Sequence, residues 1–226
     1  MKTNYNSKFK IGFEIEMVFN GDNISFENLT RKFQRLLPGI TTGHDGSIDL
    51  HDSDFYHPGD IEIKTPPLLV EPAFKLLKKV FNLVKRYGKT NHSTGFHINI
   101  SPIHNKTYHS LDPFKLIKSH LWNRIKREFN REKNEYCKSL PSCLKFKNNL
   151  DLFHKIGEAL STRRVDGEPL VGKYNAISFR NYKPIREASS RIEIRAMGGT
   201  NYHNKYNLIK KHTDLILTEF MKSCKV

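Results

Sequence analysis

Alternating apolar and polar residues predict the strands of this protein. In four segments, polar or ionisable side chains stand two residues apart, and the residues between them are mostly Ile or Phe. These segments are residues 10–16, 60–64, 95–101 and 191–195. Because successive side chains of a strand point to opposite faces, each segment turns an apolar edge one way and its polar groups the other. If the strands share a sheet, the polar groups meet on one surface.

Helical spacing of apolar residues predicts the elements between the strands. Ser25 is a typical N-cap for a first helix that ends at Pro38-Gly39, and Gly88 is the expected end of the second helix. The later helices are expected at residues 71–87, 112–131, 149–161 and 203–222. The expected strands are residues 8–19, 61–65, 95–101, 174–180 and 191–197, with loops at 43–60, 162–172 and 181–190.

The order of these elements favours an α+β fold. We expect a mostly antiparallel sheet with helices packed against its apolar face. The chain has no internal repeat and no low-complexity linker. Residues 1–226 are therefore expected to form a single domain, with the helical stretch at about 105–165 as an added layer.

Composition adds limits to this picture. With 226 residues, of which 37% are hydrophobic, the chain is long and apolar enough to bury a sizeable core. No stretch approaches 18 uninterrupted apolar residues, which argues against a membrane span. The first residues lack a hydrophobic signal region, so a cytoplasmic location is expected. The net charge of +15 should attract anions and allows an anionic macromolecule as a partner, although lysines spread over helices are also typical of an ordinary solvated surface.

Several common kinds of site are disfavoured. The odd count of cysteines, without a Cys-x-x-Cys pair, argues against a disulfide framework and a structural zinc site. Gly88-Lys89-Thr90 resembles the end of a P-loop, but it closes a helix instead of opening one. Gly167 to Gly172-Lys173 has the P-loop glycine spacing, but Tyr174 replaces the required Ser or Thr and a strand follows.

Grouped carboxylates indicate a metal site instead. Glu14 and Glu16 lie on a strand that is apolar enough to be central, where two neighbouring negative charges are costly unless a cation balances them. Glu62 and His97 occupy equivalent positions on other strands. Taken singly, each motif is also typical of an exposed strand or a structural histidine. Together they favour Mg²⁺, which prefers oxygen ligands, or Mn²⁺, which also accepts His.

The last strand adds cations to this surface. Arg191 and Arg195 flank Glu193, and an arginine side chain matches the oxygens of phosphate and carboxylate groups. Acids and arginines in phase on one face predict a multi-metal site that handles phosphate, with the cations stabilising charge as it develops.

Six motifs, in this order along the chain, carry a family resemblance. They are residues 9–16 (FKIGFEIE), 44–48 (HDGSI), 61–67 (IEIKTPP), 95–99 (GFHIN), 173–178 (KYNAIS) and 191–195 (RIEIR). The chain resembles the amidoligase family of the glutamine synthetase and glutamate–cysteine ligase superfamily, the carboxylate–amine ligases. The resemblance implies a curved antiparallel sheet of the glutamine synthetase kind, with helices on its convex face and ATP and two or three divalent ions on its concave face.

The resemblance also implies a reaction and assigns residues to it. The γ-phosphate of ATP would pass to a substrate carboxylate to give an acyl phosphate, and an amine would then displace phosphate to form an amide or peptide-like bond. The implied metal ligands are Glu14, Glu16, Glu62, His97 and Glu193. The implied catalytic residues are Arg195 and Lys173 at the phosphoryl group and Asp45 at the amine. Nucleotide or substrate binding is expected of Ser47, Lys64, Asn99, Asn175, Arg180 and Arg191.

Two positions depart from the family pattern. Lys64 stands where relatives usually have a small or apolar residue, and it would neutralise part of the acid cluster if it points there. Asn99 stands where many relatives have a second histidine.

Two other functions remain open at this point. One is a catalytically inactive nucleic-acid-binding or assembly protein with the same fold, which the positive charge suggests. The other is a metal-dependent phosphohydrolase or nuclease, because clustered carboxylates also hold two metals in such enzymes. The order of the motifs favours the ligase.

Overall fold

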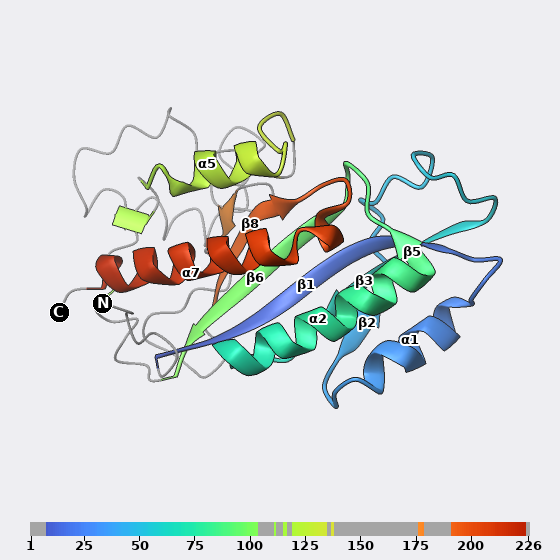
Figure 1. Ribbon diagram of the computed structural model, residues 1–226, viewed down its shortest axis with the longest axis horizontal. Coiled ribbons are helices and arrows are strands. Elements are labelled where there is room, and N and C mark those ends of the chain that lie inside the picture. The colour runs from blue at the N-terminus through green and yellow to red at the C-terminus, as the bar shows by residue number, and fades with distance from the viewer. Residues whose placement is uncertain are drawn as a thin grey trace, which may run out of the picture.

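The computed structural model describes residues 8–103, 111, 115–116, 119–134, 137, 176–178 and 191–224. In these residues the chain forms an open eight-stranded sheet with the order β2-β3-β1-β6-β8-β7, while β4 and β5 pair with the two ends of β1 (Figure 1). The strands are β1 (Phe9–Asn20), β2 (Thr41–Gly43), β3 (Pro58–Lys64), β4 (Leu68–Leu69), β5 (Gly88–Lys89), β6 (Gly95–Pro102), β7 (Ile177–Ser178) and β8 (Ile192–Gly198). The helical elements are α1 (Phe26–Gln34), α2 (Val70–Tyr87), α5 (Leu121–Glu128), η3 (Tyr202–Asn204) and α7 (Tyr206–Ser223).

All pairings between these strands are antiparallel. The expected α+β class with a mostly antiparallel sheet is therefore confirmed for the described part of the chain.

Strand β1 is the centre of the sheet, and its alternation sets the two faces. Phe9, Ile11, Phe13, Ile15 and Met17 are at most 1% exposed and belong to the core. The Phe13 ring lies 5.7 Å from that of Phe74 in α2 and 5.4 Å from that of Phe96 in β6, measured between ring centroids. Burial of such side chains contributes about 1.5–3 kcal/mol each, so this face provides much of the stability of the fold.

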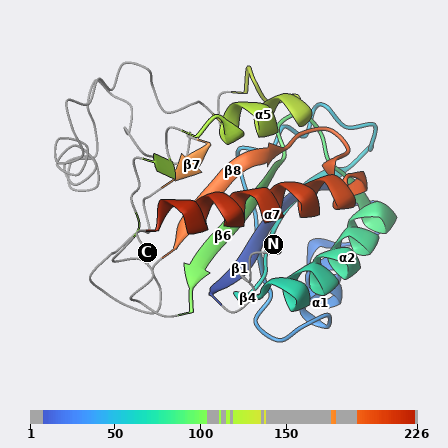
Figure 2. The ribbon, with the colours of Figure 1, turned by 60° about the vertical axis from the view of Figure 1, so that its left-hand side comes forward.

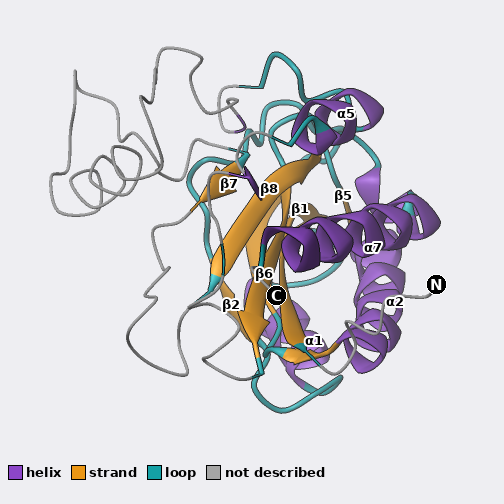
Figure 3. Cartoon of the chain, turned by 90° about the vertical axis from the view of Figure 1, so that its left-hand side faces the viewer, coloured by secondary structure: helices purple, strands orange, loops and turns teal. Residues whose placement is uncertain are grey.

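Helices α2 and α7 cover this apolar face side by side (Figures 2 and 3). Phe220 of α7 packs edge-on against Phe9, and Tyr206 at the start of α7 donates a hydrogen bond to the Phe74 carbonyl of α2. The expected packing of helices against one apolar face is confirmed. We call this side of the sheet the helical face.

The first helix begins as predicted but ends early. The Ser25 hydroxyl accepts a hydrogen bond from the Asn28 amide and caps α1. The helix ends at Gln34 and does not extend to residue 37. Pro38 disfavours a helical conformation in the residue before it, and the chain turns through Gly39, whose φ of 91° suits glycine.

Gly88 ends α2 as predicted, but for a different reason. Its φ of −163° is extended, so no left-handed conformation is needed. Instead its backbone pairs with β1, and a Cβ atom there would lie 2.2 Å from the Val18 carbonyl oxygen. The glycine is needed for close approach of two backbones.

Some predicted elements lie wholly or mostly outside the described residues. These are the helix at 149–161, the loops at 162–172 and 181–190, most of the strand at 174–180 and most of the helical layer at 105–165. Where the chain is described, α5 falls within the helix expected at 112–131, and β7 within the strand expected at 174–180. No described helix is both long and apolar enough to cross a membrane.

Candidate functional site

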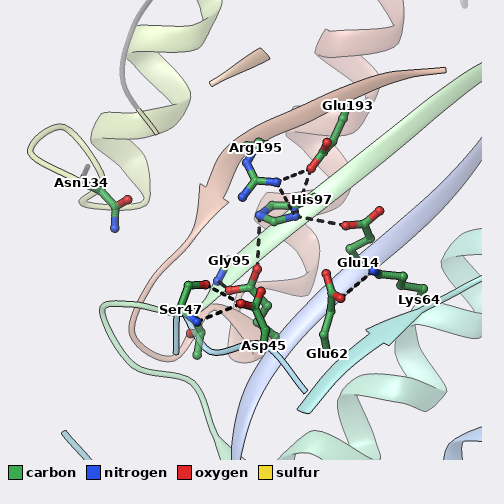
Figure 4. Close-up of polar contacts among 12 residues, drawn as sticks. Glu14, Asp45, Ser47, Glu62, Lys64, Gly95, His97, Asn134, Glu193 and Arg195 are labelled. Atoms are coloured by element: carbon green, nitrogen blue, oxygen red, sulfur yellow. Dashed lines mark hydrogen bonds and ion pairs between the residues drawn. The ribbon is translucent and has the colours of Figure 1, made fainter. Parts of the chain in front are cut away.

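The polar edges of β1, β3, β6 and β8 meet on the face of the sheet opposite α2 and α7, which we call the site face (Figure 4). The register between neighbouring strands brings these polar side chains together. Glu14 of β1 stands opposite Lys64 of β3 on one side and His97 of β6 on the other. Glu16 stands opposite Glu62. The alternation seen in the sequence therefore brings the predicted acids and histidine together.

His97 is the hub of this cluster. It is 2% exposed, and its Nδ1 atom lies 3.5 Å from a Glu14 oxygen and 3.3 Å from a Glu193 oxygen. Its Nε2 atom lies 3.6 Å from a Glu16 oxygen. Two groups of potential metal ligands result, each with ligand atoms within 4.8 Å of one another. The groups are Glu14, His97 and Glu193, and Glu16, Glu62 and His97.

Glu16 is the most deeply buried acid of the cluster. It is 3% exposed, and the Gly95 amide donates a hydrogen bond to its Oε2 atom. A Cβ atom on residue 95 would lie 2.5 Å from His97 Nε2 and 3.0 Å from Glu16 Oε1, so glycine is required there. The direct opposition of Glu16 and Glu62 places like charges side by side, which destabilises a sheet unless a cation intervenes.

Two cations of the chain border the acids. Arg195 donates from Nη1 to Glu193 and lies 3.4 Å from His97 Nδ1, while its buried Nε atom has no hydrogen-bond partner within the described residues. Lys64 Nζ lies 2.7 Å from Glu62 Oε2. Lys64 therefore points into the acid cluster and partly neutralises it, as its position suggested.

The pKa values of the acids are driven apart. Burial tends to raise the pKa of Glu14, but hydrogen bonds from His97 and Asn99 and the nearby positive charges bring it to about 2. Burial raises the pKa of Glu62 above its usual value, since Lys64 only partly offsets burial and the charge of Glu14. One carboxylate is thus held firmly ionised beside another that resists ionisation.

Asn99 and Arg191 continue this network away from His97. The Asn99 amide nitrogen donates to Glu14 at 2.9 Å, and its amide oxygen accepts from Arg191 Nε at 3.0 Å. Both predicted residues therefore join the cluster. Their contact with nucleotide or substrate stays a prediction.

Asp45 and Ser47 lie on the loop between β2 and β3. The Ser47 amide and hydroxyl both donate to Asp45 Oδ1, at 2.9 and 2.7 Å, and the Asp45 amide donates to Asp60 Oδ2 at 2.6 Å. Burial tends to lower the pKa of Lys64, but Glu62 and the negative charges of Glu14 and Asp45 raise it overall. Asp45 is therefore close enough to act on the cluster electrostatically, although it belongs to neither ligand group.

Three supporting contacts were not predicted. Asp60 fixes the Asp45 loop, the Gly95 amide holds Glu16, and the fully buried Tyr202 donates its hydroxyl to the Glu16 carbonyl at 2.6 Å. Asp60 continues the alternation of Glu62 and Lys64 along β3, so the sequence pattern could have predicted that its side chain lies on the site face. The backbone contacts depend on register and left no signal in the sequence.

Three predicted site residues lie outside the described residues: Lys173, Asn175 and Arg180. Their roles remain predictions.

Comparison with known proteins agrees with the motifs. The sequence matches the model of a family described as "Putative amidoligase enzyme" over residues 43–162, more than half of the chain. The match includes Asp45, Ser47, Glu62 and His97 and begins after β1. No curated protein matches the chain. The resemblance drawn from the six motifs is thus confirmed, and the chain belongs to the amidoligase family.

Proposed function

We propose that the protein is an ATP-dependent carboxylate–amine ligase that forms an amide or peptide-like bond through an acyl-phosphate intermediate. One observation carries the proposal. Four carboxylates from three strands surround a single buried histidine in two overlapping ligand groups, with the arginine Arg195 at their edge. The family match supports ligase chemistry, and the antiparallel sheet with helices on one face supports a glutamine synthetase-like fold in a single domain.

The donor set suits Mg²⁺ or Mn²⁺. Glu14, Glu16, Glu62 and Glu193 supply hard oxygen donors, and His97 supplies a nitrogen that Mn²⁺ also accepts. The two ligand groups share His97, and the direct opposition of Glu16 and Glu62 is the kind of repulsion that a divalent ion relieves. We propose two or three ions at this site. Bound there, they would polarise the phosphate oxygens of ATP and offset their charge.

Arg195 has the position to act on the phosphoryl group. Its Nη1 atom donates to Glu193 at the edge of the two ligand groups, and a guanidinium carries further N–H donors that match the oxygens of a phosphate group. A carboxylate oxygen of the substrate would attack the γ-phosphorus as the bond to ADP breaks. Arg195 would stabilise the charge of the transferring group, with assistance expected from Lys173.

Asp45 has the position to act on the amine. The Ser47 hydroxyl and amide orient its carboxylate at the margin of the cluster. The amine nitrogen would attack the acyl carbon, the bond to phosphate would break, and Asp45 would take the proton that nitrogen loses. Asn99 and Arg191, together with Asn175, Arg180, Ser47 and Lys64, are proposed to face the nucleotide or the substrates.

An acyl-phosphate trap tests the proposal without knowledge of the natural amine. Hydroxylamine converts an acyl phosphate into a hydroxamate, so it can replace the amine while a panel of amino acids and dicarboxylates is supplied with ATP and Mn²⁺. We expect ADP release with hydroxamate formation in the wild type. Loss of an electrostatic donor typically costs about 10²–10³ in kcat, so Arg195→Ala and Glu16→Gln should lose most of this activity.

The exposed lysine Lys222, far along α7, provides a matched control, and Lys222→Gln should retain wild-type activity. Wild-type turnover by Arg195→Ala and Glu16→Gln would remove the site assignment. Release of phosphate without hydroxamate would favour a metal-dependent phosphohydrolase instead. ATP-independent binding to nucleic acid that Glu16→Gln leaves intact would favour the inactive binding protein.

A further inference from the structure

A second pocket lies on the helical face, away from the acids. It has a volume of about 330 Å³ and is lined by residues from the C-terminal half of α2, from η3 and from the start of α7. Its lining includes Lys78 and Lys85 of α2, His203 of η3 and Lys205 just before α7. We call it the lysine pocket.

The lysine pocket is positively charged and lacks any compensating acid in its lining. Neither Lys78 nor Lys85 forms an ion pair with a described residue. The Lys205 ammonium lies 5.2 Å from the centre of the Phe129 ring, not beside a carboxylate. The two lysines of α2, in a lining that contains no carboxylate, create a field that favours an anionic ligand.

The start of α7 adds unused hydrogen-bond donors. The first backbone bond into this 18-residue helix runs from the Ile209 amide to the Lys205 carbonyl. Lys205 provides no side-chain cap, and the first turn has no acid. The amides of residues 206–208, all of which line the pocket, have no acceptor within the described residues. A helix start with free amides and a positive dipole end is suited to phosphate.

His203 is an independent sign that a ligand belongs there. Its side chain lines the pocket although the residue is only 5% exposed. Its Nδ1 atom is 3.0 Å from the Thr90 hydroxyl, and its Nε2 atom has no partner among the described residues. Burial, assisted by the positive charge of Lys85, lowers the pKa of His203 to about 4. A largely buried ring thus turns one nitrogen to the pocket beside the lysines of α2.

We propose that the lysine pocket binds the phosphate group of a small phosphorylated metabolite, at a site separate from the acid cluster. The helix start and the lysines would hold the phosphate oxygens, and His203 would contact the ligand through Nε2. Ligand pockets commonly measure about 300–1,000 Å³, so this volume suits a small ester better than a phosphate ion alone. The charges converge in a pocket instead of following an extended stripe, which favours a small molecule over nucleic acid.

Titration with ribose 5-phosphate tests the proposal. The full chain would be titrated by calorimetry and by NMR at constant ionic strength, with EDTA present so that no metal draws the anion to the acid cluster. We expect one saturable site and shifts of the amide signals of residues 206–208. Lys78→Met and Lys85→Met should each weaken binding about tenfold, because each removes a charge-assisted contact.

Lys210→Met is the matched control, since Lys210 lies on the same helix but pairs with Glu71 outside the pocket lining. It should leave the dissociation constant unchanged, and thermal unfolding confirms that each variant is folded. Inorganic phosphate should bind at the same site but more weakly than the ester. Non-saturating shifts, or equal loss of affinity in Lys210→Met and Lys85→Met, would overturn the proposal. Tight binding of single-stranded DNA, weakened equally by all three variants, would replace it with a diffuse basic surface.

Discussion

The helical face and the site face of the same strands differ in how neighbouring side chains affect one another. On the helical face, Phe13 and Phe96 touch across the β1–β6 pairing, and each added apolar contact stabilises the fold. On the site face, Glu16 lies opposite Glu62, and each added negative charge makes it harder for the neighbouring carboxyl groups to ionise. One face thus holds the sheet together, while the other places like charges side by side, a repulsion that a bound cation would relieve.

Truncation of a core ring should give the largest effect on stability. Phe96 contacts Phe13, Phe81 and Tyr202, so Phe96→Ala removes packing on several sides. We expect a loss of about 3–5 kcal/mol in the free energy of unfolding, measured by denaturant titration in EDTA. Glu16→Gln should change the same quantity by less than about 1 kcal/mol, or increase it. Comparable losses in the two variants would erase the distinction between the faces.

Addition of metal should selectively stabilise the site face. Manganese at one hundred times its dissociation constant should add about 2.7 kcal/mol to the free energy of unfolding of the wild type, because it binds only the folded cluster. Glu16→Gln and Glu193→Gln should lose most of this gain, and Phe96→Ala should keep it, provided that it is folded. Thermal unfolding with and without Mn²⁺ provides the measurement. An equal gain in all variants would place the metal elsewhere.

Acid should weaken the helical side at His203. The unfolded chain takes up a proton there near pH 6.5, whereas the folded protein resists protonation until about pH 4. The unfolded state thus binds more protons between these values, and stability falls as pH decreases through this window, by at most about 3 kcal/mol. Denaturant titrations at pH 7 and 5 should show a smaller pH dependence in His203→Gln. An unchanged dependence would contradict the burial of this ring.

The smallest expected effect concerns Lys64. Its pair with Glu62 is half exposed on the lysine side, and such pairs contribute about 0–1 kcal/mol. Lys64→Met should therefore leave stability within about 1 kcal/mol of the wild type. It should tighten Mn²⁺ binding, because it frees Glu62 from a competing ammonium group. Weaker Mn²⁺ binding, measured by calorimetry, would show that Lys64 supports the site instead.

The alternation along β1 and β6 was sufficient to predict both faces of the sheet. Side chains of a strand alternate between its faces every two residues, so the pattern can be read from neighbouring residues alone. It located Glu14, Glu16 and His97 on one surface before any register was known. The same logic failed for β2, β4 and β5, which are too short to show a period. The early end of α1 was also missed, since Leu36 and Leu37 are apolar at helical spacing but lie in the turn before Gly39.

Features that depend on how distant segments meet could not be predicted. The hydrogen bond from Gly95 to Glu16 needs the register between β6 and β1. The lysine pocket forms because the start of α7 lies beside Lys78 and Lys85 of α2. No pattern of neighbouring residues in the sequence predicts that contact. Glycine at position 95 was visible as a small residue before a histidine, but the reason for it, the space occupied by Glu16 and His97, exists only in the folded sheet.

The central position of β1 has a consequence for the order of events during synthesis. The Tyr202 hydroxyl reaches the Glu16 carbonyl across 186 residues of chain, and Arg195 reaches His97 across 98. Long-range pairings of this kind form slowly, since the intervening chain must be ordered first. Strand β1 gains both of its main neighbours, β3 and β6, well before β8 is made, but Glu193 and Arg195 join the acids of β1 only with β8. Premature termination anywhere before β8 would leave a chain with Glu14 and Glu16 but no completed cluster.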